Sequence, residues 1–167
     1  MMKYKAAIIT MSDSRQNGNK PDLSGDVVRE ILEDNEWEVV YRVIISDDEE
    51  GIVKELLKCS DEFNIPLIIT NGGTGFSQRD HTPEATKKVI EREVLGISEA
   101  MRAKSNEITP RGMLSRGVSG IRKNSLIINL PGSPKAVREC LSYVIVPIRH
   151  GVEILIGEAS MCGESHD

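Results

Sequence analysis

Three glycines within four residues, followed by an arginine and an aspartate, form the stretch of this sequence best suited to chemistry. An apolar run at residues 67–69 leads into Gly72-Gly73-Thr74-Gly75, and Arg79-Asp80 comes soon after. Glycine lets the backbone approach a ligand closely, and successive N–H groups can form a concave site for an anion such as phosphate. An acidic side chain beside those amides would repel phosphate unless it also held a metal ion. The stretch therefore favours a phosphate site that includes a metal ion.

The glycine-rich stretch differs from the two best known phosphate-binding patterns. In a P-loop the second glycine precedes a lysine and then a serine or threonine, whereas Gly75 precedes Phe76-Ser77. The glycines also lack the spacing of the dinucleotide-binding fingerprint. An ordinary glycine-rich turn between a strand and a helix is therefore the alternative. The presence of Arg79-Asp80 directly before a helix favours a functional site over that alternative.

The residues on either side indicate where this stretch lies in the fold. Residues 67–69 are apolar and rich in β-branched side chains, as in a buried strand. Thr82-Pro83-Glu84 is a strong helix start, which predicts Thr82 as the N-cap and Pro83 as the first helical residue. A glycine-rich turn at the carboxyl end of a buried strand is where open α/β sheets bind anionic ligands.

A second acidic cluster follows the predicted strand Trp37–Ile45. Ser46 precedes four consecutive acids, Asp47 to Glu50, which stand directly before a segment with helical periodicity. In the plain interpretation Ser46 or Asp47 caps this helix and the other acids favour its dipole. If the strand lies in the same sheet as residues 67–69, however, Asp47 and Asp80 meet at one sheet edge.

Polar turns also follow the other two predicted strands. Ser12-Asp13 comes after residues 6–10, and a Pro-Gly-Ser-Pro-Lys turn at 131–135 comes after Ser125–Leu130. Strands that alternate with helices predict an α/β fold, a three-layer sandwich whose mostly parallel sheet carries helices on both faces. Four turns then converge on one edge. Their carboxylates, glycines and arginines suit a metal-assisted reaction on a phosphorylated ligand.

Residues 113–124, rich in glycine, serine and basic side chains, allow two interpretations. They could form a solvent-facing hairpin or connector. They could instead bind phosphate, with Arg116 and Arg122 as forked ligands.

The remaining segments predict helices at 84–94, 97–103, 136–144 and 146–156, with Gly96 as a break. Asp22 or Ser24 could cap an earlier helix, preceded by a mobile loop at 16–25. Residues 157–167 are small and polar, and we expect a flexible tail.

Length and composition describe one domain over residues 1–167. The net charge of −5 argues against non-specific binding to nucleic acid or anionic membranes. No apolar run approaches the roughly 20 residues that span a bilayer, and the first residues lack a signal-peptide pattern. We therefore expect a cytoplasmic protein. The three cysteines and three histidines are scattered, which disfavours disulfides and a structural zinc site.

Three motifs in this sequence resemble the molybdopterin adenylyltransferase family, the Mog/MoaB-type proteins of molybdenum cofactor biosynthesis. The first runs from Thr70 through the glycines to Arg79-Asp80 and Thr82-Pro83-Glu84-Ala85. The other two, at 114–122 and 128–136, follow in the same order as in that family. The resemblance covers roughly residues 6–156, and the three motifs together are highly specific.

The resemblance implies an enzyme that transfers AMP from ATP to the terminal phosphate of molybdopterin and releases pyrophosphate. It further implies a homotrimer and a downstream molybdate-insertion protein that receives the product. The two important aspartates of the family fall on Asp47 and Asp80, and either could anchor the expected Mg²⁺. Substrate-binding groups are then expected at Ser12, Asp13, Gly72, Gly73, Thr74, Gly75, Ser115, Arg116, Pro131, Gly132 and Ser133.

Two alternatives to the enzyme are a molybdopterin carrier of the same fold and a module that senses an unrelated phosphorylated ligand. A carrier would gain nothing from acids beside a phosphate, so Asp47 and Asp80 favour the enzyme. The sensing module leaves the two later motifs unexplained. Fold alone does not decide between these functions.

Overall fold

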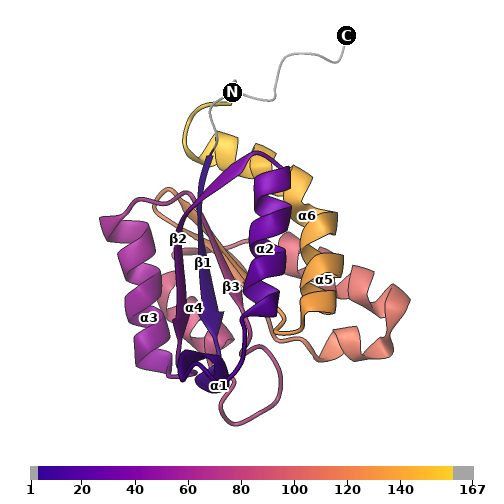
Figure 1. Cartoon of the computed structure of the whole chain (residues 1–167). Coiled ribbons are helices and arrows are strands. Elements are labelled where there is room, and N and C mark those ends of the chain that lie inside the picture. The colour runs from indigo at the N-terminus through magenta and orange to yellow at the C-terminus, as the bar shows by residue number, and fades with distance from the viewer. Residues whose placement is uncertain (1–3, 160–167) are drawn as a thin grey trace.

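A six-stranded sheet forms the centre of the computed structural model, which describes residues 4–159 (Figure 1). In spatial order its strands are β2 (Trp37–Ile45), β1 (Tyr4–Met11), β3 (Leu67–Asn71), β6 (Ser125–Leu130), β5 (Ser119–Arg122) and β4 (Arg92–Glu93). The first four are parallel, β5 is antiparallel to β6, and β4 is antiparallel to β5. The carboxyl ends of the four parallel strands therefore lie at one edge, which we call the carboxyl edge.

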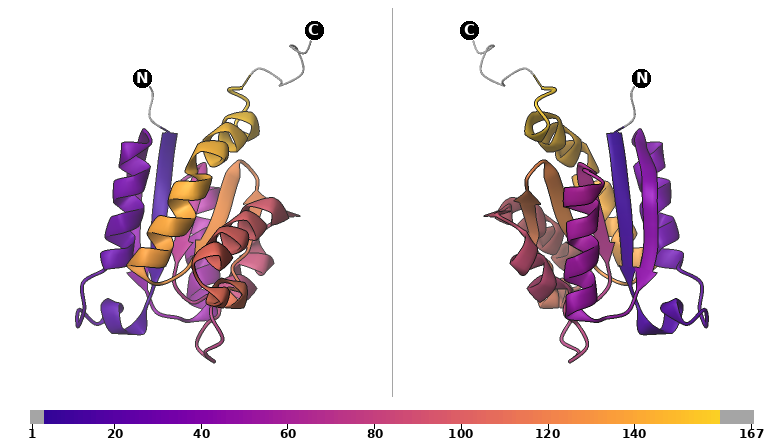
Figure 2. Two further views of the ribbon diagram at one scale, coloured as in Figure 1. Left: turned by 90° about the vertical axis from the view of Figure 1, so that its right-hand side faces the viewer. Right: turned by 90° about the vertical axis from the view of Figure 1, so that its left-hand side faces the viewer.

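Helices cover both faces of the sheet, which confirms the predicted three-layer α/β sandwich (Figure 2). On one face α2 (Leu23–Asp34), α5 (Leu95–Ile108) and α6 (Pro134–Leu155) share a core with Ala6 and Ile8 of β1. On the other face α3 (Glu49–Leu57) and α4 (Thr82–Val89) pack around Ala7 and Ile9. Successive side chains of a strand point to opposite faces, so the continuous apolar run of β1 supplies both cores. None of the helices within residues 4–159 is both long and apolar enough to cross a bilayer.

The helix boundaries differ from the sequence predictions at three places. Helix α4 ends at Val89 and is followed by β4, so the predicted helix 84–94 is wrong in its second half. Gly96 does not break a helix, because it is the second residue of α5, which runs on to Ile108. The predicted helices 136–144 and 146–156 are one helix, α6, with Pro147 inside it. Pro147 is exposed, as is Tyr143, so the carbonyl that the proline leaves unpaired is open to water.

The residues that cap the helices differ from three further predictions. Ser46, Asp47 and Thr82, which were predicted as possible caps, do not cap a helix. Asp48, rather than Ser46 or Asp47, caps α3 by accepting a hydrogen bond from Gly51 N at 2.8 Å. Thr82 is the first residue of α4 rather than its N-cap. The predicted loop 16–25 is shorter, because the short helix α1 (Asp13–Gln16) precedes it and Asp22 caps α2.

Two of the three cysteines, Cys59 and Cys140, lie within the described residues, and both are buried free thiols. Burial raises the pKa of the Cys59 thiol to about 12, which leaves it protonated and unreactive at neutral pH. Cys162 lies outside the described residues, as do residues 160–167, which make up most of the predicted tail.

Arg122 lies away from the carboxyl edge. The segment around it forms the hairpin of β5 and β6, and Arg122 is the last residue of β5, opposite Ser125 at the start of β6. It binds both carboxylate oxygens of Asp61, Nε to Oδ1 at 2.8 Å and Nη2 to Oδ2 at 2.7 Å. Asp61 belongs to the π-helical turn η1 (Lys58–Glu62). The interpretation of Arg122 as a phosphate ligand is therefore wrong, and its role is to join η1 to the hairpin.

We expect Asp61→Asn to lower the melting temperature at neutral pH and to flatten the acid side of the stability curve. The hydrogen bonds from Arg122 hold the pKa of Asp61 well below its usual range. Its carboxylate therefore stabilises the fold above the unfolded pKa, and that contribution is lost as the pH falls through the folded pKa. Thermal melts should show the gap between parent and variant narrowing below about pH 4. Glu62→Gln is the control, because Glu62 is a neighbouring exposed carboxylate outside this ion pair. A difference in melting temperature between parent and Asp61→Asn that does not change with pH would contradict the lowered pKa of Asp61.

Candidate functional site

The turns after β1, β2, β3 and β6 meet at the carboxyl edge, as predicted. Asp13 N, after β1, donates to Asp47 Oδ2 after β2 at 3.2 Å. Gly72 N, after β3, donates to Leu130 O at the end of β6 at 3.1 Å. The segment before β5 joins them, because Arg116 N donates to Thr74 O at 2.9 Å. The site thus draws on segments more than 100 residues apart in the sequence.

The glycine-rich turn passes very close to the neighbouring strand. Gly72 and Gly73 have φ angles of +98° and +68°, a left-handed conformation that side chains rarely adopt. A Cβ atom on Gly72 would lie 2.6 Å from the carbonyl oxygen of Met11. The Thr82 hydroxyl, which the sequence suggested as a helix cap, instead donates to Gly72 O at 3.0 Å. The conformation of the turn is therefore held from both sides.

Asp47 and Asp13 hold one another in place. The Asp13 backbone donates to the Asp47 carboxylate, and the Asp47 backbone donates to Asp13 Oδ1 at 3.1 Å. Burial, and after it the charges of Asp13 and Asp80, raise the pKa of Asp47, although the hydrogen bond from Asp13 acts in the opposite direction. By contrast, hydrogen bonds from Ser46, Asp47 and Arg79 lower the pKa of Asp13. Asp47 is therefore disfavoured as a carboxylate by burial and by the like charges of Asp13 and Asp80, whereas Asp13 is stabilised as one.

Asp80 closes the loop that follows the glycines. Its Oδ2 accepts a hydrogen bond from Ser77 N at 2.9 Å, and its own N–H donates to Ser77 O at 3.0 Å. A Cβ atom on Gly75 would lie 2.9 Å from Asp80 Oδ2, so the carboxylate also packs against the glycine turn. A Cβ atom on Gly73 would lie 3.4 Å from Asp47 Oδ1, so Asp47 and Asp80 both lie against this turn, at the edge where the sequence pattern predicted them.

Arg116 reaches the site, but its donors are engaged by the protein itself. Nε donates to Gly75 O at 2.7 Å, Nη2 donates to Asp80 O at 2.8 Å, and Nη1 pairs with Glu84. These contacts fasten both ends of the loop 75–80 to the start of α4. A direct contact between Arg116 and substrate stays a prediction.

The serines of the site divide in their roles. Ser12 Oγ caps α1 by accepting from Arg15 N at 3.3 Å, and Ser133 Oγ caps α6 by accepting from Ala136 N at 3.2 Å. Gly132 lies against the glycine turn, since its Cβ atom would be 3.4 Å from the Gly72 Cα. Ser115 lines a cavity instead.

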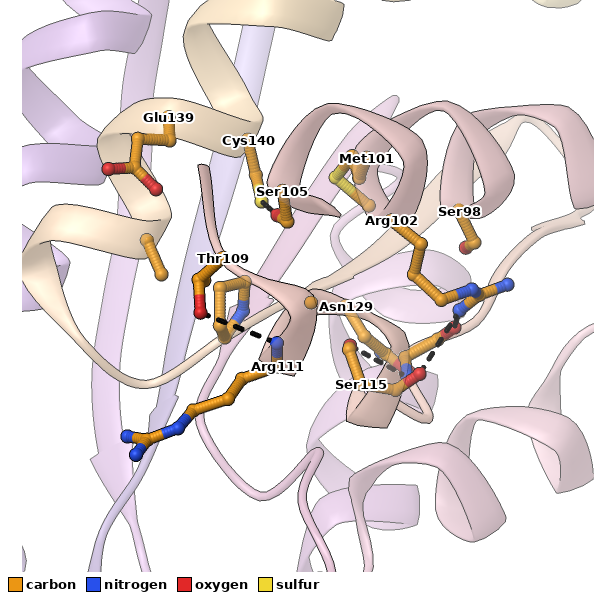
Figure 3. Close-up of a pocket in the computed structure, with 14 residues that line it drawn as sticks. Ser98, Met101, Arg102, Ser105, Thr109, Arg111, Ser115, Asn129, Glu139 and Cys140 are labelled. Atoms are coloured by element: carbon orange, nitrogen blue, oxygen red, sulfur yellow. Dashed lines mark hydrogen bonds between the residues drawn. The ribbon is translucent and has the colours of Figure 1, made fainter. Parts of the chain in front are cut away.

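That cavity, of about 190 Å³, lies between α5, α6 and the 3₁₀ helix η2 (Pro110–Leu114) (Figure 3). Ser115, Asn129 and Pro131 bring it to the carboxyl edge. Arg102 borders it and donates to Gly117 O at 2.8 Å, and Ser105 and Cys140 face one another across 3.3 Å. No local pattern in the sequence predicted this cavity, because its walls come from α5, η2, residues 115–117, residues 129–131 and α6.

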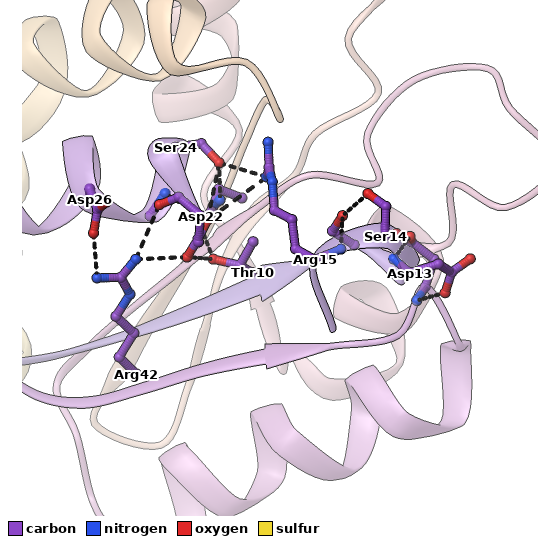
Figure 4. A network of polar contacts seen from close by, with 12 residues as sticks. Thr10, Asp13, Ser14, Arg15, Asp22, Ser24, Asp26 and Arg42 are labelled. Carbon is purple, nitrogen blue, oxygen red and sulfur yellow. Dashed lines mark hydrogen bonds and ion pairs between the residues drawn. The ribbon is translucent and has the colours of Figure 1, made fainter. Parts of the chain in front are cut away.

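The sequence pattern also did not predict a buried polar network beneath the glycine turn (Figure 4). Asp22 Oδ2 accepts from the Thr10 hydroxyl and from Arg42 Nη2, both at 2.9 Å. Asn71, directly before the glycines, donates to Ser24 at 2.9 Å, and its Oδ1 lies 3.1 Å from the Thr10 hydroxyl, whose one proton is shared between Asn71 and Asp22. Burial acts to raise the pKa of Asp22, but hydrogen bonds, led by that from Arg42, outweigh it and lower the pKa. The sequence pattern had indicated only that Asp22 or Ser24 could cap a helix.

Comparison with known proteins identifies the family of this chain. A sequence model described as "Probable molybdopterin binding domain" matches residues 7–150. This chain belongs to that family. It is 40% identical over 169 residues to the molybdopterin adenylyltransferase of Helicobacter pylori strain J99, covering 99% of this chain and 96% of the relative. It is also 38% identical to molybdenum cofactor biosynthesis protein B of Staphylococcus aureus strain COL, over 86% of each chain.

A solved structure supports the family assignment independently. The molybdopterin biosynthesis enzyme MoaB of Thermus thermophilus superposes on this molybdopterin-binding domain with a TM-score of 0.88. The two sequences are 40% identical, and the match covers 92% of this chain and 97% of the other.

We expect Gly72→Ala to destabilise the fold by about 1–3 kcal/mol, the scale of one strained backbone position. The new methyl group would enter a left-handed conformation and meet the Met11 carbonyl. Gly96→Ala is the matched control, because its Cβ atom would meet nothing within 4 Å, and helical glycine-to-alanine changes stabilise by about 0.5–1 kcal/mol. Urea denaturation of both variants checks this, and equal stabilities would contradict the close approach.

Proposed function

We propose that this protein is a molybdopterin adenylyltransferase that transfers AMP from ATP to the terminal phosphate of molybdopterin. The observation that carries the proposal is the left-handed glycine turn between Asp47 and Asp80 at the carboxyl edge. Amide donors with carboxylates beside them suit a polyanion that arrives with a cation. The 40% identity, over nearly the full length of both chains, to a relative named molybdopterin adenylyltransferase supports the choice of reaction.

In this reaction the nucleophile is an oxygen of the pterin phosphate. It forms a bond to the α-phosphorus of ATP, the bond from that phosphorus to the bridging oxygen breaks, and pyrophosphate leaves with the electron pair. The protein is therefore required to position two anions and to stabilise charge. The amides of Gly73, Thr74 and Gly75 are the proposed donors toward the phosphates, whereas Gly72 N is already bonded to Leu130 O. The turn at Pro131 and Gly132 lies beside them.

The carboxylates fit the expected Mg²⁺. Within residues 4–159 no cluster of three or more histidine, cysteine, aspartate or glutamate side chains has the geometry of a complete metal site. Mg²⁺ however usually keeps several waters and takes one or two protein carboxylates together with substrate phosphates. Asp47 and Asp80 would supply those carboxylates. The pKa of Asp47 is raised mainly by burial and further by the charges of Asp13 and Asp80. Bound Mg²⁺ would neutralise charge on the phosphates.

The cavity beside Ser115 is the proposed place for the pterin end of molybdopterin. Asn129 and Pro131, at the carboxyl end of β6, are among the residues that line it. Its volume of about 190 Å³ is below that of typical ligand pockets, about 300–1,000 Å³, so it would enclose part of the ligand. The phosphate would then point toward the glycines.

The decisive assay is incubation of the purified protein with ATP, Mg²⁺ and molybdopterin. We expect pyrophosphate and an adenylylated pterin to appear together and in equal amounts. Pterin binding without either product would support a carrier, and ATP binding without pterin binding would support a sensing module.

We predict that Asp80→Asn retains the fold and pterin binding but reduces turnover by at least about tenfold. Asparagine keeps the acceptor for Ser77 N, whereas it loses the charge that would hold Mg²⁺. Asp47→Asn should behave similarly, because Asp48, rather than Asp47, caps α3. Steady-state rates over a series of Mg²⁺ concentrations test both variants, with the exposed Asp34→Asn as control. Near-parental turnover at low Mg²⁺ would refute the assignment.

We further propose that the protein acts as a cytoplasmic homotrimer and passes its product to a molybdate-insertion protein. Light scattering at micromolar concentration should give the mass of three chains, and a monomer would contradict the trimer.

A further inference from the structure

Arg79 forms an exposed ion pair at the carboxyl edge. Its Nε lies 3.1 Å from Asp13 Oδ2, and its Nη2 lies 2.9 Å from Oδ2 and 3.0 Å from Oδ1. The side chains are 58% and 45% exposed. Ion pairs between exposed groups contribute little to stability, so this one can open at small cost.

Two other arginines on the same turns are held more firmly. Arg116 donates to two backbone carbonyls and pairs with Glu84, and Arg15 donates to the buried Ser24 hydroxyl at 2.9 Å. Moving either one would leave protein acceptors without their donors. Arg79 differs, because its fork can leave Asp13 while Ser46 Oγ and Asp47 N still donate to that carboxylate.

The backbone that carries Arg79 is fixed even though its side chain is exposed. Arg79 N donates to Ser77 Oγ at 3.3 Å, and the bonds between Ser77 and Asp80 close the loop around it. The guanidinium lies near enough to Asp47 for its charge to act on the pKa of that carboxyl. A rotation of the side chain would therefore keep the guanidinium at the edge where the glycine amides lie.

We propose that Arg79 binds the triphosphate of ATP and that Asp13 holds it when ATP is absent. The proposal rests on the proposed function, which brings ATP to this edge. A guanidinium fork matches two phosphate oxygens as well as it matches a carboxylate, and the triphosphate carries more negative charge than Asp13. Arg79 is thus a substrate-binding residue with a resting partner, and Asp13 competes with ATP for it.

A double-mutant cycle measured by calorimetry tests this exchange. The parent, Arg79→Gln, Asp13→Asn and the double variant are titrated with ATP and, separately, with inorganic tripolyphosphate, each with excess Mg²⁺. We expect Arg79→Gln to weaken both ligands by roughly 10- to 100-fold, the scale of one or two charge-assisted hydrogen bonds. Asp13→Asn should strengthen binding when Arg79 is present and change it little when Arg79 is absent.

Arg149→Gln is the matched control. Arg149 pairs with Glu36 and Glu153 near the opposite end of α6, and its loss removes the same charge without touching the carboxyl edge. It should bind both ligands as the parent does. Thermal melts of the Arg79 and Asp13 variants should stay close to the parent, because the pair is exposed.

Three outcomes would overturn the inference. They are parental affinity in Arg79→Gln, an Asp13→Asn effect of equal size in both backgrounds, and a parent that binds neither ligand. The second outcome would mean that Asp13 acts on ATP through its charge alone. Failure of the proposed function is distinguishable, since a parent that binds ATP through Arg79 but makes no adenylylated pterin would leave this inference standing.

Discussion

Residue 72 has to be glycine because the turn after β3 passes against the end of β1. A Cβ atom there would lie 2.6 Å from the Met11 carbonyl, and the φ angle of +98° excludes most side chains. Gly132 approaches the same point from the end of β6. This close approach of three connections brings Asp13 and Asp47 beside the glycine amides. The binding edge therefore depends on backbone packing before any side chain takes part.

The carboxyl edge gathers the carboxylates of Asp13, Asp47 and Asp80, which also hold its turns together. Burial and the charges of Asp13 and Asp80 raise the pKa of Asp47, which means that its ionised form is disfavoured there. The protein offsets this in part, through the Asp13 and Ser77 amides and through Arg79. A buried carboxylate beside like charges and a glycine turn fits a site for phosphates that arrive with a metal ion.

Much of this architecture was predictable from local patterns, because apolar runs followed by polar turns mark the carboxyl ends of buried strands. The positions of Asp47 and Asp80 followed from that rule. Other features depend on contacts that no local pattern reveals. Pro147 is accepted inside α6 because it is exposed, and Asp22 is buried because Arg42 and Thr10 meet it from β2 and β1. The cavity beside Ser115 has walls from five segments, so it forms only when the chain is folded.

The arginines show most clearly where sequence patterns stop being informative. Arg79, Arg116 and Arg122 all stand in motifs rich in glycine and serine, and each has the same forked group. Their partners separate them, because Arg122 joins Asp61 to the Val89 carbonyl and Arg116 binds backbone carbonyls of the loop it fastens. The guanidinium of Arg79 has side-chain partners instead, Asp13 and Ser46. A guanidinium that satisfies backbone acceptors would leave them unpaired if it moved, whereas one paired to an exposed carboxylate leaves a group that water can solvate. The nature of the partner, rather than the residue type, therefore decides which arginine is free to meet a ligand.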